Sequence, residues 1–146
     1  MPKLELLDAE IDYSPKIIMV DDEEAHFLTT QASFKHANFE NELIYLRSGY
    51  ELMDYLLKKG EHAEDGHSNP LLILLDLYMP GFNGNQVIET ILQNTQLPPQ
   101  RISLLTTAKK EHVKSIGLKK MPYMKKPLTF DKLYQFIVAS KQFEIK

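Results

Sequence analysis

The chain contains no cysteine, little net charge and no apolar run approaching the length of a membrane span. The lack of cysteine excludes disulfides, thiolate metal ligands and cysteine nucleophiles. A bilayer-spanning helix needs about 20 apolar residues, and the N-terminal residues mix acids with leucines, unlike a signal peptide. A net charge of −3 does not indicate bulk nucleic-acid binding. We therefore expect a cytoplasmic protein that engages neither a membrane nor nucleic acid.

The 146 residues are enough for one domain with a full core. The apolar share of 43% and the charged share of 25% are ordinary for a globular protein. We expect an N-terminal extension over residues 1–15, a domain over 16–140 and a short tail over 141–146. The residues that follow Pro127 suffice for one helix and this tail, so we expect no separate output domain.

Two unbroken apolar runs, at 16–20 and 71–75, predict strands that are buried on both faces, as in a parallel sheet. Shorter apolar segments predict further strands at 43–46, 102–105 and 123–125. Amphipathic periodicity predicts helices at 25–36, 49–59, 85–94, 111–119 and 131–140. This alternation of strands and helices is typical of a doubly wound parallel α/β sheet with helices on both faces.

Polar side chains follow four of these predicted strands. Asp21 and Asp22 follow the first strand, Asp76 the third, Thr106 the fourth and Lys126 the fifth. The carboxyl ends of parallel strands meet at one edge of a sheet, so these groups should converge there. Clustered carboxylates raise one another's pKa unless a cation neutralises them. A ligand set made only of oxygen atoms favours Mg²⁺.

Such a site suits the transfer of a phosphoryl group to a carboxylate. Asp76 would be the nucleophile that forms an aspartyl-phosphate, while a metal ion and Lys126 neutralise charge. The hydroxyl of Thr106 could donate a hydrogen bond to a phosphoryl oxygen. Flavin binding on the same fold is disfavoured, because the first loop, DDEE, would repel a phosphate.

Four sequence segments together resemble the receiver domain of two-component response regulators, over about Lys16 to Ser140. The segments are IIMVDDEE, LLILLDLYMPGFNG, LLTTA and YMKKP. They match the family pattern of a paired acid, an acceptor aspartate before a Pro-Gly turn, a strand-end threonine and a Lys-Pro pair. The resemblance implies a flavodoxin-like fold whose five strands have the order 2-1-3-4-5.

The resemblance also assigns roles to individual residues. It implies that Asp76 is the phosphoacceptor and that Lys126, rather than Lys125, contacts the phosphoryl group together with Thr106. Three further residues would complete the Mg²⁺ site around Asp76, and they are Asp22 as a direct ligand, Asp21 through water and Tyr78 through its backbone carbonyl.

Thr106 and Tyr123 match the family's switch residues. The implied phosphodonor is a sensor histidine kinase or a histidine phosphotransfer protein, and the output is a contact with an unidentified protein or onward phosphotransfer. A homodimer could form through the face made by residues 111–120, Tyr123–Lys125 and Asp131–Ser140. We expect no enzyme activity beyond the chain's own phosphorylation and dephosphorylation.

Three other interpretations compete with this one. A phosphatase of the haloacid dehalogenase type needs a second acid two residues after the nucleophile, where this chain has Tyr78. A pseudo-receiver that binds proteins constitutively usually lacks a site residue, and here all are present. The loop over residues 61–70 holds His62, His67 and three acids that could bind a metal, but a solvated loop is the favoured interpretation.

Overall fold

A computed structural model describes residues 4–6, 16–60, 72–94, 101–106, 123–140 and 143–145. The expected helix at 111–119 and the loop at 61–70 lie outside these ranges. None of the helices in the described ranges is long and apolar enough to cross a membrane. The described elements are β1 (Leu4–Leu6), β2 (Ile17–Val20), α1 (Glu24–His36), β3 (Leu43–Leu46), α2 (Gly49–Leu57), β4 (Leu72–Asp76), α3 (Gly84–Gln93), β5 (Arg101–Thr106), β6 (Tyr123–Lys125), α5 (Phe130–Ser140) and β7 (Phe143–Ile145).

Five of these strands form one parallel sheet in the order β3-β2-β4-β5-β6. Counted along the chain within this sheet, the order is 2-1-3-4-5, so the predicted fold class is confirmed. β2 pairs with β3 on one side and β4 on the other, with Val20 opposite both Leu46 and Leu75. β2 and β4 are buried along their whole lengths, as the two unbroken apolar runs predicted.

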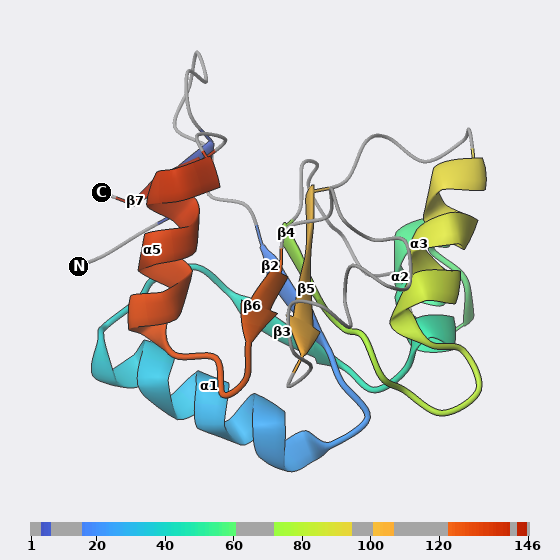
Figure 1. Ribbon diagram of the computed structural model, residues 1–146, viewed down its shortest axis with the longest axis horizontal. Helices are drawn as coiled ribbons and strands as arrows, with labels where there is room; N and C mark the ends of the chain where they lie inside the picture. Colours follow the sequence, from blue (N-terminus) through green and yellow to red (C-terminus); the bar gives the residue numbers. More distant parts are fainter. Residues whose placement is uncertain are drawn as a thin grey trace.

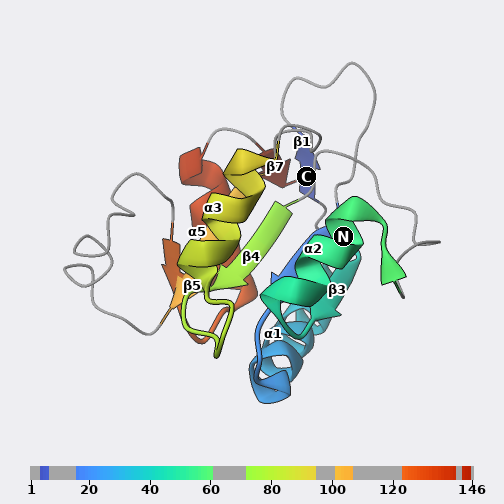
Figure 2. The same cartoon turned by 90° about the vertical axis from the view of Figure 1, so that its right-hand side faces the viewer.

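Helices cover both faces of the sheet. Figure 1 shows α1 and α5 on one side and α2 and α3 on the other, and in Figure 2 α2 and α3 lie in front of β4. Alternate residues of each strand serve the two layers, because successive side chains point to opposite faces. Ile17 and Met19 pack with the α1–α5 layer, whereas Ile18 and Val20 pack with the α2–α3 layer.

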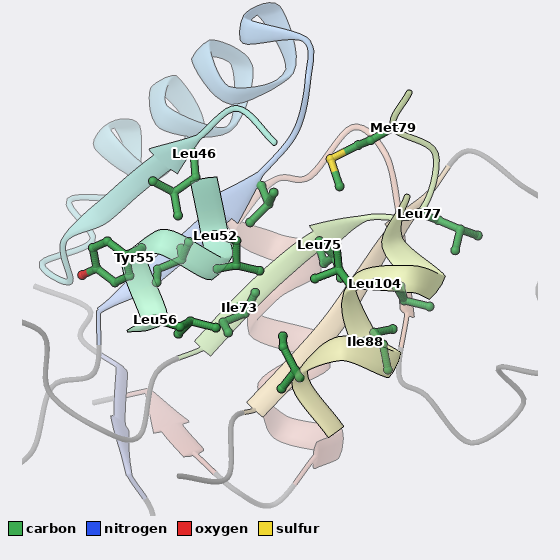
Figure 3. Packing of buried hydrophobic residues seen from close by; sticks show 14 residues of the cluster. Leu46, Leu52, Tyr55, Leu56, Ile73, Leu75, Leu77, Met79, Ile88 and Leu104 are labelled. Atoms are coloured by element: carbon green, nitrogen blue, oxygen red, sulfur yellow. The ribbon is translucent and has the colours of Figure 1, made fainter. Parts of the chain in front are cut away.

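The α2–α3 layer is a continuous apolar core. Figure 3 shows Leu56 of α2 beside Ile73 of β4, and Leu52 of α2 and Ile88 of α3 belong to the same buried cluster as Ile73 and Leu75. The last two are fully buried. This packing fixes β4, and therefore the position of the aspartate at its end.

One feature was not expected from the sequence. β1 and β7 form a separate two-stranded antiparallel sheet, with Leu4 opposite Ile145 and Leu6 opposite Phe143. β7 follows α5 closely and lies beside it (Figure 1). The residues assigned to the extension and to the tail therefore meet in the folded chain.

Candidate functional site

The predicted site residues do come together at the carboxyl edge of the sheet. Asp21 directly follows β2, Asp76 is the last residue of β4, and Lys126 directly follows β6. Thr106 ends β5, where its backbone pairs with Lys125; its side chain lies outside what the structure describes. The convergence follows from parallel pairing, which brings the ends of neighbouring strands to one edge.

Three carboxylates form the acidic part of the site. Asp21, Asp22 and Asp76 each offer an oxygen atom, and these atoms lie within 4.8 Å of one another. Asp21 and Asp76 are buried, while Asp22 is exposed. Oxygen-only donors with partial access to solvent are the set that hard divalent cations such as Mg²⁺ prefer. The residues present therefore fit such an ion.

The ammonium group of Lys126 lies inside this acidic cluster. Its Nζ is 2.7 Å from Oδ2 of Asp21 and 3.2 Å from Oδ2 of Asp76. The lysine side chain is only 8% exposed, so these contacts are largely shielded from solvent. A buried ammonium between two buried carboxylates is stable only as part of such a group of paired charges.

The surroundings of Asp76 raise the pKa of its carboxyl above the ordinary value. Burial raises the pKa of Asp76 from 3.8 to about 6, against the opposing effect of Lys126. The neighbouring Asp21 carboxylate raises this pKa further, and the backbone N–H of Tyr78, which donates to Asp76 Oδ1 at 3.2 Å, lowers it. A bound cation would favour the ionised form and make the carboxylate available as a nucleophile.

The loop after Asp76 is shaped by two glycines. Gly81 has a φ of 78°, which L side chains rarely adopt. A Cβ on Gly84 would lie 2.7 Å from the backbone oxygen of Asp76, so a larger residue there would displace the acceptor strand. α3 then begins with a capping box, in which Asn83 and Gln86 exchange side-chain-to-backbone hydrogen bonds.

The other residues predicted for the site lie in surroundings that differ from one residue to the next. Asp21 and Asp22 do not cap α1, because the N-cap residue is Glu23, whose N–H donates to Asp21 Oδ1 at 2.9 Å. The side chain of Tyr78 is 49% exposed beside the acceptor. Tyr123 is partly buried and packs against the α2–α3 core. The proposed switching of Tyr123 with Thr106 stays a prediction.

One side chain of the site was not predicted from the sequence. His26, in the first turns of α1, lies 2.9 Å through Nδ1 from both Asp21 Oδ2 and Lys126 Nζ. The available signal was its place five residues after Asp21, on the same face of α1 as the buried Thr30. That signal is weak without knowing how α1 packs.

Comparison with known proteins agrees with this geometry. The family model of the response regulator receiver domain matches residues 17–138. Response regulator Rcp1 of Synechocystis is 32% identical over 132 residues, covering 88% of each chain. The Mn²⁺-bound structure of Rcp1 has a TM-score of 0.63 at 31% identity, covering 83% of this chain and 88% of that one.

Two further solved structures are similar. The bacteriophytochrome response regulator AtBRR has a TM-score of 0.77 at 26% identity, covering 88% of this chain and 94% of that one. The phosphorylated cyanobacterial phytochrome response regulator RcpA has a TM-score of 0.63 at 29% identity, covering 87% and 89%. With the five-stranded order and the rim of acids already described, these matches show that the chain belongs to the response regulator receiver domain family of two-component signalling.

Proposed function

We propose that this receiver accepts a phosphoryl group on Asp76 in a Mg²⁺-dependent reaction. The observation that carries the proposal is the buried Asp76 carboxylate, 3.2 Å from the Lys126 ammonium and grouped with Asp21 and Asp22. Two related structures support it, since one is of a phosphorylated regulator and the other is of a Mn²⁺-bound one.

The donor would be a phosphohistidine on a sensor kinase or a histidine phosphotransfer protein, as is general for receiver domains. A carboxylate oxygen of Asp76 attacks the phosphorus atom, a P–O bond forms, and the P–N bond to the donor imidazole breaks. The departing imidazole keeps the bond's electron pair and takes a proton from solvent. Lys126 is placed to bind a phosphoryl oxygen and to balance its charge.

Asp21, Asp22 and Asp76 would hold the metal ion, together with the backbone carbonyl of Tyr78. When bound, the ion supplies charge neutralisation at the transferring phosphoryl group. The burial of Asp21 and Asp76 reduces the access of water to this group. The resulting acyl phosphate would then be lost by hydrolysis, which regenerates Asp76, or by onward transfer to a histidine phosphotransfer protein.

The output would be a change of surface rather than catalysis on another substrate. Phosphorylation adds a charge of roughly −1.5 to −2 beside Lys126. We propose that Thr106 and Tyr123 relay this change to the face of Tyr123–Lys125 and α5, which a protein partner or a second copy would read. A constitutive pseudo-receiver is less favoured, because the acids and the lysine are all present and assembled.

The test is labelling with acetyl phosphate and Mg²⁺, followed by intact-mass measurement. The parent protein should gain one phosphoryl group, and Asp76→Asn should gain none. Asp54→Asn is the matched control, because Asp54 is an exposed aspartate of α2 away from the acidic cluster. Labelling of Asp76→Asn at the parent level, or equal labelling without Mg²⁺, would contradict the proposal.

A further inference from the structure

The imidazole of His26 belongs to the same group of contacts as the acids and the lysine. Its Nδ1 lies 2.9 Å from Lys126 Nζ, and its Nε2 lies 3.4 Å from Glu23 Oε2. Nδ1 also lies 2.9 Å from Asp21 Oδ2. His26 therefore connects the loop that carries the acid pair with the lysine that follows β6.

The hydrogen-bonding chemistry of these atoms favours one position for the imidazole hydrogen. An ammonium group can only donate hydrogen bonds, so the 2.9 Å contact of Lys126 Nζ with His26 Nδ1 is a hydrogen bond in the tautomer that carries its hydrogen on Nε2. In that tautomer Nε2 can donate to the carboxylate of Glu23, which lies 3.4 Å away. The short approach of Nδ1 to Asp21 has the same cause, because both atoms accept from the one ammonium group.

The ammonium of Lys126 has three N–H groups and three acceptors around it. They are Asp21 Oδ2 at 2.7 Å, His26 Nδ1 at 2.9 Å and Asp76 Oδ2 at 3.2 Å. Asp21 Oδ2 and His26 Nδ1 lie only 2.9 Å from each other, so they accept from the same side of the ammonium group and leave a further N–H for the acceptor carboxylate. A group held in this way meets an incoming phosphoryl oxygen with little loss of freedom.

Helix α1 is a rigid support for this arrangement. Thr30 and Ser33, on the same face as His26, hold the chain just beyond Lys126. The Thr30 hydroxyl donates to the carbonyl of Leu128 at 3.2 Å, and the Ser33 hydroxyl accepts from the N–H of Phe130 at 2.9 Å. The segment that carries Lys126 is thus fixed to α1 at three points one turn apart.

We propose that His26 is a positioning residue of the acceptor site, which accepts a hydrogen bond from Lys126 and directs its ammonium at the phosphoryl group on Asp76. The proposal rests on the phosphoacceptor function proposed above. It assigns to this site a side chain that acts through Lys126 and does not touch the phosphoryl group.

Binding of beryllofluoride, a phosphoryl mimic, tests the proposal in the presence of Mg²⁺. His26→Leu should lower the affinity for beryllofluoride about tenfold, the value of one hydrogen bond to a charged group. His26→Asn should restore most of it, because its side-chain oxygen can occupy the position of Nδ1. His36→Leu is the matched control, an exposed histidine of the same helix, and should bind as the parent does.

Affinity for Mg²⁺ alone separates this role from general damage to the site. It should stay near the parent value in His26→Leu. Unchanged beryllofluoride affinity in His26→Leu would overturn the proposal, and so would an equal loss of Mg²⁺ affinity, which would locate the defect in the acid pair. Failure of His26→Asn to recover binding would also count against it.

Nitrogen NMR of the metal-free protein gives a readout that does not need the acceptor function. The His26 signal, identified by its loss in His26→Asn, should show the neutral ring with hydrogen on Nε2. The Lys126 ammonium should give a protected signal that His26→Leu weakens. Hydrogen on Nδ1, or an unaltered Lys126 signal, would overturn the proposal. If the parent fails to bind beryllofluoride, the phosphoacceptor function is refuted, and these signals still decide whether His26 holds Lys126.

Discussion

The two faces of the sheet are covered by helices in different ways. On the α2–α3 face, apolar side chains such as Leu52, Leu56 and Ile88 pack onto β4. On the α1–α5 face, apolar packing is joined by polar contacts from α1 to the segment after β6. The first face fixes where Asp76 lies, and the second determines where Lys126 lies. Asp76 and Lys126 lie in the right positions relative to each other only if the packing on both faces forms. The two faces depend on different kinds of interaction.

The largest expected effect is a loss of packing on the α2–α3 face. Ile88 is 2% exposed, so Ile88→Ala should lower the free energy of unfolding by about 2–5 kcal/mol. Chemical denaturation measures this loss, and Glu89→Ala, at the neighbouring exposed position, is the control. The folded variant should still be labelled by acetyl phosphate. If labelling disappears while the variant remains folded, the two faces are not separable in the way described.

Asp76 ends β4, the strand that both helix layers cover, and its carboxyl should make the free energy of unfolding depend on pH. Its pKa in the folded chain is about 6 against an ordinary 3.8, a difference worth about 3 kcal/mol. Because this pKa is raised in the folded chain, Asp76 contributes most favourably to the free energy of unfolding below pH 3.8. This contribution is lost as the pH rises through 6.

In the metal-free protein, the substitution Asp76→Asn should remove this pH-dependent loss of stability, because the asparagine side chain does not ionise. The variant should match the parent near pH 4 and be more stable by up to about 3 kcal/mol above pH 6. Urea unfolding with a chelator at several pH values measures the difference. Added Mg²⁺ should reduce it, since the ion favours the ionised carboxylate of the parent. If the difference in stability between Asp76→Asn and the parent did not change with pH, the burial of the Asp76 carboxyl would not be the cause of that difference.

The smallest expected change concerns the polar contacts of the α1–α5 face. Thr30→Val keeps the shape of a fully buried side chain but leaves the Leu128 carbonyl without its donor. The expected loss of stability is about 1–3 kcal/mol, with weaker beryllofluoride binding because the Lys126 segment loses a support. Thr90→Val on α3 is the control, since its hydroxyl bonds within its own helix. If Thr30→Val and Thr90→Val had equal effects on stability and on beryllofluoride binding, the proposed difference between the two faces would be contradicted.

The sequence predicted the sheet and the acidic rim for clear physical reasons. The unbroken apolar runs that end in Asp21 and Asp76 required buried parallel strands, and parallel strands bring their ends together. The helices predicted at 25–36, 49–59, 85–94 and 131–140 lie within one or two residues of their bounds in the structure. These signals are local, so a single sequence contains them.

Other features depend on contacts between distant parts of the chain. The contact of His26 with Lys126 joins residues 100 positions apart, and it needs the packing of α1 to be known. The pairing of β1 with β7 involves strands of three residues each, too short to show a periodic pattern. The role of Tyr78 came from family resemblance alone, and the roles of Tyr78 and Thr106 stay predictions.

The antiparallel pairing of β1 and β7 has a mechanical consequence. Leu4 lies opposite Ile145, so both strands lead to the ends of the chain from the same end of the ribbon. A force that pulls the two ends apart would load the hydrogen bonds of this ribbon one pair at a time, as in unzipping. The ribbon would open at low force, and the chain would lengthen before any load reached α5 and the central sheet.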